Sequence, residues 1–188
     1  MRRLFVRAVM GLLTFCLFAL FWTPLAFLLA SPPYGYSDGV IGLFGLAGAV
    51  GAMAANLGGR MADRGKGEFA TTLGLLALLL SWLPLGFAGH SLVALLIGVL
   101  VLDFAVQLIH VSNQNAVFKV RPLARNRLNA GYITCYFIGG ALGSLLGAQL
   151  YGPYGWNGIV TAGGLISALA LGIWVVMPRR SGLSVSAA

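Results

Sequence analysis

Apolar residues fill this chain in six long runs, separated by short stretches of turn-forming and charged residues. A helix needs about 20 mostly apolar residues to cross the hydrocarbon core of a bilayer. Runs of that length lie at 6–30, 39–60, 69–88, 92–118, 128–151 and 156–177. The pattern predicts an all-α membrane protein of six transmembrane helices, forming one domain over 1–178 with a short tail at 179–188.

The composition supports a membrane protein over a soluble one. Hydrophobic residues make up 59% of the chain and its mean hydropathy is +0.91, more apolar surface than a soluble domain of this size can hide. The first run is longer than the core of a secretory signal, and Leu28, Leu29 and Ala30 lack a small-x-small cleavage pattern, so we expect it to stay as a helix.

The net charge of +8 comes from twelve Lys and Arg residues that fall beside alternate ends of the runs. We expect Arg2, Arg3 and Arg7 to precede the first helix; Arg60, Arg64 and Lys66 follow the second run; Lys119, Arg121, Arg125 and Arg127 follow the fourth; Arg179 and Arg180 follow the sixth. Cytoplasmic loops carry such an excess, so we expect both termini in the cytoplasm, in a bacterial inner membrane. This one-sided distribution argues against nucleic acid as a partner.

The fourth run carries a polar stripe. Asp103, Gln107, His110 and Gln114 are spaced by 4, 3 and 4 residues, which places them within about 60° of one another on a helix. Asp103 lies 11 residues after Leu92, about 16 Å into the bilayer, where a charge costs at least about 2.5–3.5 kcal/mol. We therefore expect the stripe to face other helices or a water-filled cavity.

Two readings of the stripe stay open. In one, Asp103 is paired inside the bundle in a structural hydrogen-bond network. In the other, the stripe lines a cavity, and Asp103 or His110 takes up and releases a proton, for which both side chains are chemically suited. Asn113 lies off the stripe and is expected to bond between helices. Phe18 and Trp22 on the first run face either such a cavity or lipid.

The fifth run has a glycine face. Gly139, Gly143 and Gly147 recur at four-residue spacings, so they lie nearly on one side of a helix, where the backbone of a neighbour can approach closely. We expect this face to be a helix-packing surface. Static packing and a sliding contact both fit the spacing.

Little in the sequence indicates an enzyme. Ser144 could serve as a nucleophile only if His110, on another run, reached it. The chain holds two His residues and no HExxH motif, so we expect no catalytic residues, no metal and no cofactor. The cysteines Cys16 and Cys135 lie within apolar runs and are expected to act as small packing residues.

Two stretches carry a family resemblance. The segment GGRMADRGKGE at 58–68 resembles the loop of the major facilitator superfamily that joins the second and third helices of a six-helix half, with Gly59, Ala62, Asp63 and Arg64 matching. The segment at 102–147 resembles the tenth and eleventh helices of efflux-type members. It includes an Arg-Pro-x-x-Arg-x-Arg-x-Asn joint formed by Arg121, Arg125 and Arg127.

The resemblance implies the C-terminal half of a proton-coupled efflux transporter of a small solute, built from two inverted three-helix repeats. It implies a partner, either a missing N-terminal six-helix half or a second copy, and places the stripe on the interface toward it. Asp63 would then latch a helix of the other half; alternatively its loop is solvated and only sets topology. A fragment that does not transport, or a helical assembly module, is the alternative function. The substrate cannot be read from these residues.

Overall fold

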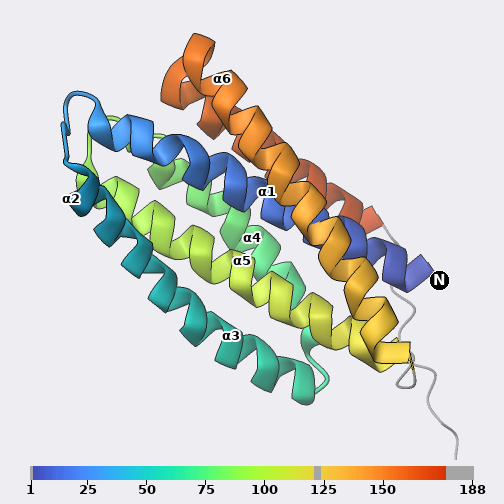
Figure 1. Ribbon diagram of the computed structural model, residues 1–188. Coiled ribbons are helices and arrows are strands. Elements are labelled where there is room, and N and C mark those ends of the chain that lie inside the picture. Colours follow the sequence, from blue (N-terminus) through green and yellow to red (C-terminus); the bar gives the residue numbers. More distant parts are fainter. Residues whose placement is uncertain (1, 121–123, 177–188) are drawn as a thin grey trace, which may run out of the picture.

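The computed structural model describes residues 2–120 and 124–176, which are entirely helical apart from their turns (Figure 1). In chain order the elements are α1 (Arg2–Ala30), α2 (Asp38–Leu43), the 3-10 helix η1 (Phe44–Ala47), α3 (Gly48–Asp63), α4 (Gly67–Leu85), α5 (Leu92–Val120) and α6 (Arg125–Val176). Of the helices described, α1, α4, α5 and α6 are long and apolar enough to cross a membrane.

Three of the predicted runs differ in detail from the helices. The run at 39–60 is divided into α2, η1 and α3, and the runs at 128–151 and 156–177 are joined in the 52 residues of α6. The path of α6 breaks at Gly155, where φ is 59° and ψ is −155°. Residues other than glycine rarely adopt that backbone conformation. Gly155 therefore allows the chain to turn back, and it divides α6 into an earlier and a later helix.

The main hydrophobic core lies where α1, α4, α5 and α6 meet. It is built largely of leucines from α1, α4 and α5, with Trp156 and Trp174 from the later part of α6. In contrast, α3 packs along α5, where Gly58 lies against Leu108 and Val111. Figure 1 shows α3 on the outside of α5, at the edge of the bundle.

The earlier part of α6 lies directly on the backbone of α1. A Cβ added at Gly139 would overlap the carbonyl of Leu12, and one added at Gly143 would overlap that of Cys16. At Gly147 the added Cβ would lie 3.1 Å from the carbonyl oxygen of Leu20. The glycine face therefore meets successive turns of α1, where a side chain at any of the three positions would push the helices apart.

Tryptophan side chains join α4 to the later part of α6. The Trp82 indole donates to Ser167 Oγ (2.9 Å), Trp156 donates to the Leu85 carbonyl (2.8 Å), and Trp174 donates to Thr72 Oγ1 (2.9 Å). Trp82 also fills the space above Gly163. Buried indoles need an acceptor for their N–H group, and here each finds it on the neighbouring helix.

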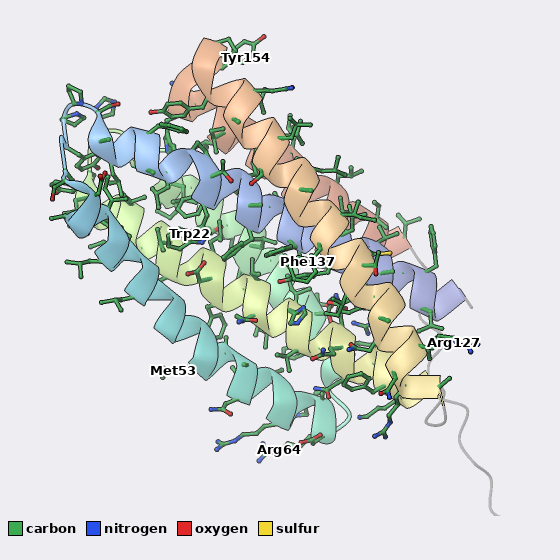
Figure 2. All side chains as sticks on the ribbon, in the orientation of Figure 1. Trp22, Met53, Arg64, Arg127, Phe137 and Tyr154 are labelled. Atoms are coloured by element: carbon green, nitrogen blue, oxygen red, sulfur yellow. The ribbon has the colours of Figure 1, made fainter. Side chains whose placement is uncertain are left out.

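Arg64 and Arg127 lie at the same end of the bundle. Figure 2 shows Arg64 after α3 and Arg127 at the start of α6 at the end where the N-terminus lies, and Tyr154 at the opposite end. One sequence prediction is wrong in detail: Arg2, Arg3 and Arg7 do not precede the first helix but belong to α1, and Arg7 is buried, with 8% of its surface exposed.

The glycine face yields a stability prediction. Replacing Gly143 by Ala forces α1 and α6 apart at Cys16, and overpacking of this kind costs about 1–3 kcal/mol. The matched control is Gly164→Ala in the same helix, where an added Cβ meets nothing within 4 Å and a small gain is expected from the lower flexibility of the unfolded chain. Unfolding free energies in bicelles measure both, and equal effects would contradict the close packing.

Candidate functional site

Asp103 is buried at the middle of α5, with 3% of its surface exposed. Its Oδ1 accepts a hydrogen bond of 3.1 Å from the Trp22 indole on α1. Its Oδ2 is buried and has no partner among the residues that the structure describes. A buried carboxylate oxygen without a hydrogen bond is costly while the group is charged, so this site favours a protonated carboxyl or an added ligand atom.

The other stripe residues reach α6. His110 Nδ1 lies 3.2 Å from the hydroxyl of Tyr132, and Gln114 Nε2 donates to Asn129 Oδ1 at 3.2 Å. Gln107, between Asp103 and His110, is half-buried. The stripe therefore does face helices of the bundle, but it contacts two of them: Asp103 is bonded to α1, and His110 and Gln114 are bonded to α6.

A row of aromatic rings connects the two ends of this site. We call Trp22, Phe18, Phe15, Tyr136 and His110 the aromatic row. Ring centroids are 6.0 Å apart for Trp22 and Phe18, 5.5 Å for Phe18 and Phe15, 4.1 Å for Phe15 and Tyr136, and 4.5 Å for Tyr136 and His110. All five side chains are half-buried. The row gives α1 and the earlier part of α6 a shared, partly open apolar surface beside Asp103 and His110.

A second polar cluster lies nearer the charged end. Arg7 Nη1 donates to Thr71 Oγ1 (2.7 Å) and to Asn113 Oδ1 (2.8 Å), and its guanidinium lies 4.7 Å from the ring centroid of Trp174. These four residues, which we call the Arg7 joint, come from α1, α4, α5 and α6. Arg7 thus holds together four helices whose sequence positions are far apart.

The charged loop at 58–68 ends α3 with a glycine-dependent turn. The Lys66 amide donates to the Met61 carbonyl (2.8 Å) and the Gly65 amide to the Ala62 carbonyl (3.1 Å), with Gly65 at a φ of 75°. This is the Schellman arrangement, which favours glycine at that position. Lys119 from α5 donates to the same Ala62 carbonyl at 2.9 Å, placing a cation at the negative end of the α3 dipole.

Asp63, the last residue of α3, is exposed, as are Arg64, Arg125 and Arg127. Among the side chains that the structure describes, none forms an ion pair with Asp63. Gly59 has open space where a Cβ would lie. With Gly59, Asp63, Arg64, Arg125 and Arg127, Arg121 completes the cytoplasmic gating loops that the family resemblance implies, and it lies outside the described residues.

The hydrolase alternative depended on Ser144 and His110 meeting. Ser144 Oγ instead lies 2.6 Å from Thr23 Oγ1 on α1, and the recorded partner of His110 is Tyr132. In the described part of the chain, these two residues therefore form no nucleophile–base pair.

Three polar side chains at these sites have roles that the sequence does not predict. Arg7 counts by its charge among the cations that set topology, although it falls within the apolar run that forms α1. Lys119 belongs to the same one-sided charge distribution, and Tyr132 carries no signal of its own. The sequence signal for Arg7 was its position one residue inside the first run, whereas nothing in the spacing distinguishes Tyr132 from the other aromatic residues nearby.

Comparison with known proteins gives one family and a small set of relatives. The sequence model of the Major Facilitator Superfamily matches residues 11–187. The chain is 54% identical over 168 residues to the "Putative uncharacterized transporter YgaY" of Escherichia coli K12, covering 89% of this chain and 43% of that protein. It is 32% identical over 164 residues to the "Probable transporter SCO4007" of Streptomyces coelicolor, covering 85% and 37%.

The chain therefore spans less than half the length of these curated relatives. No solved structure matches it.

The bond between Trp22 and Asp103 yields a prediction for a double-mutant cycle. Replacing Trp22 by Phe and Asp103 by Leu, singly and together, should give a coupling of about 0.5–1.7 kcal/mol, the range of interhelical hydrogen bonds in membranes. Unfolding free energies in bicelles provide the measurement. The matched cycle with Trp82→Phe should give none, because the Trp82 indole bonds to Ser167; equal couplings would refute the pairing.

Proposed function

The chain belongs to the major facilitator superfamily, and on that premise we propose that it is one half of a transporter that moves a small solute by proton-coupled efflux. The membrane location and the transporter family are established by the apolar helices and the family match. The finer proposal rests above all on Asp103, whose carboxylate lies buried at the middle of an apolar helix with one oxygen unbonded within the described residues.

The proposed topology has six spans with both ends in the cytoplasm. The spans are α1, the unit of α2, η1 and α3, then α4, α5, and the two parts of α6 on either side of Gly155. Two inverted repeats of three spans accommodate this order. The grouping of Arg64, Arg127 and the N-terminus at one end of the bundle supports a bacterial inner-membrane protein with that end inside.

The proposed partner is an N-terminal six-helix half. The alternative partner is a second copy of this chain. The length of the relatives, more than twice that of the matched segment, favours the separate half. It would close over the face formed by α1, α3, α5 and the earlier part of α6, where the aromatic row is half-open. Asp63 and Arg64, exposed at one edge of that face, would latch against it on the cytoplasmic side.

In the proposed mechanism, Asp103 and His110 bind and release the proton while Gln107, Gln114, Phe18 and Trp22 line the solute path. A buried carboxyl is stabilised in its neutral form, so gaining a water contact favours release of its proton. Solute binding at the aromatic row would displace Trp22 and thereby change the environment of Asp103. The alternative, an assembly module that does not transport, requires Asp103 to stay sealed from water in every state.

Topology can be tested by labelling single cysteines. In a background with Cys16→Ala and Cys135→Ala, Gly89→Cys lies between α4 and α5 and Glu68→Cys lies at the start of α4. A membrane-impermeant maleimide added to intact cells should label Gly89→Cys and leave Glu68→Cys unlabelled until the cells are opened. The reverse pattern would invert the proposed orientation, and labelling of both from outside would contradict the span count.

Transport can be tested in proteoliposomes that hold this chain with a co-expressed N-terminal half from a relative. Vesicles carrying a proton gradient and an internal pH dye are screened with small organic solutes, and the solute that discharges the gradient is then followed by radiolabel. Asp103→Asn should abolish gradient-driven movement of that solute but retain its exchange across the membrane. The control is Asn157→Asp, which changes charge at an exposed site of α6. Full coupling in the double variant Asp103→Asn with His110→Ala would remove both residues from the mechanism.

The reading frame next to the gene offers a second check of the partner. A neighbouring or fused frame encoding six apolar spans would support the transporter half. Cysteine labelling at Asp103→Cys tests the assembly alternative, because that position would then resist a water-soluble reagent under all gradients and with all solutes.

A further inference from the structure

Tyr132 is a buried side chain that occupies the point where α1, α5 and α6 meet. Its exposed fraction is 3%, and its ring fills the space beside Gly11, where an added Cβ would lie 2.7 Å from a ring carbon. Its hydroxyl lies 3.2 Å from His110 Nδ1. The same hydroxyl faces the side chain of Asn113, one turn further along α5.

Asn113 connects Tyr132 to the Arg7 joint. Its Oδ1 accepts the 2.8 Å hydrogen bond from Arg7, and its Nδ2 is buried without a partner of good geometry among the described residues. Asn113 itself has no exposed surface. One amide group therefore has its acceptor occupied by Arg7 and its donor free beside the Tyr132 hydroxyl.

This arrangement fits a neutral His110. A neutral imidazole that uses Nδ1 as an acceptor carries its proton on Nε2, and the Tyr132 hydroxyl then donates to Nδ1. The oxygen of that hydroxyl keeps lone pairs directed at the Asn113 amide donor. Along the path from His110 through Tyr132 and Asn113 to Arg7, each donor group then faces an acceptor.

A protonated His110 reverses the first link. Both imidazole nitrogens then carry hydrogen, so Nδ1 donates to the Tyr132 oxygen and the Tyr132 proton must turn to another acceptor. The side chain that faces the hydroxyl is Asn113, which can accept only through Oδ1. Turning that oxygen toward Tyr132 presents Nδ2 to Arg7, and two donors then face each other.

We infer that Tyr132 is a positioning residue that transmits the protonation state of His110 through the Asn113 amide to the Arg7 joint. The inference rests on the proposed proton-coupled function and names the route by which a proton would loosen the contact of α1, α4 and α5. One N–H bond forms, at His110 Nδ1, with the proton that the proposed coupling supplies. The hydrogen bond between His110 and Tyr132 then reverses direction, and the Tyr132 hydroxyl turns to donate toward Asn113.

Among the residues that the structure describes, few titratable or charged groups lie around His110. The titratable and charged side chains near it are Tyr132 and Tyr136 on α6, Arg7 on α1 and, two turns away, Asp103 on α5. In this region α4 contributes the neutral Thr71, and α3 meets α5 through Gly58 against Leu108 and Val111. Among these groups, Asn113 is the acceptor that a turned Tyr132 hydroxyl would meet, and its Oδ1 also accepts the hydrogen bond from Arg7.

The chain allows a direct spectroscopic test because it has two histidines. The full chain is placed in lipid nanodiscs with 15N-labelled histidine and asparagine, and imidazole and side-chain amide signals are followed against pH. His90, exposed between α4 and α5, is the internal reference. The Asn113 amide signal is identified by its absence from Asn113→Gln.

In the unmodified chain, the Asn113 signal should shift at the same midpoint as that of His110, and neutral His110 should carry its proton on Nε2. Tyr132→Phe removes the hydroxyl alone; His110 should still titrate, while the shift of Asn113 at that midpoint is lost. Tyr136→Phe is the matched control, since its ring also lies against His110 but its hydroxyl is not the partner of Nδ1, and the shift should persist.

An Asn113 signal that ignores the His110 midpoint in the unmodified chain would overturn the inference without any variant, as would a shift that survives Tyr132→Phe. This outcome is separable from failure of the transporter proposal. Proton-driven transport with no response at Asn113 leaves the function standing and removes this route. A clear response at Asn113 in a protein that moves no solute with its partner half would contradict the proposed transport function. The route from His110 through Tyr132 to Asn113 would then still stand.

Discussion

A polar side chain inside a membrane bundle has no bulk water to turn to, so it needs a partner within the protein. In the described part of this protein, the buried hydroxyls of Thr14 and Ser81 bond to carbonyls of their own helices, whereas the indoles and Arg7 bond across helices. Indole N–H groups bond to Asp103, Ser167, the Leu85 carbonyl and Thr72, each on a different helix from the donor. Arg7 is bonded to α4 and α5 at once. Cross-helix hydrogen bonds therefore fix which helices are neighbours and where along their length they meet.

The glycine face acts by a different force. In the hydrocarbon core, an apolar side chain is equally well placed against lipid or against another helix, so hydrophobic burial does not drive helices together. Close van der Waals packing between helices therefore contributes more of the stability. Gly139 and Gly143 allow α6 to lie on the carbonyls of α1. The same approach brings Ser144 to Thr23 and Tyr136 onto Phe15. The polar and aromatic contacts of the site thus depend on the absence of side chains at these two glycines.

Much of the fold could be predicted from hydropathy because a span is defined by length and apolarity, both of which are local. The charged stretch after the second run could be placed as a loop from its residue types, although α3 continues to Asp63, three residues past the predicted end of that run. Lys119 and Arg7 could not be assigned this way, since their roles depend on which carbonyl or amide a distant helix brings within reach. The stripe on α5 was predicted as one face, but a face of a central helix touches two neighbours, and spacing cannot say which residue meets which.

The contacts between helices fall into two groups, which differ in whether they involve titratable side chains. The later part of α6 is joined to α4 by indole bonds to Ser167, Thr72 and a backbone carbonyl, which involve no titratable group and so do not respond to pH. The pairing of α1 and α5 with the earlier part of α6 passes through Asp103, His110 and Tyr132, whose hydrogen bonds change with protonation. Under the proposed coupling, a proton or a solute that changes these bonds acts first on the second pairing. The Arg7 joint, which includes Thr71 of α4 and Trp174 of α6, then connects that pairing to the first.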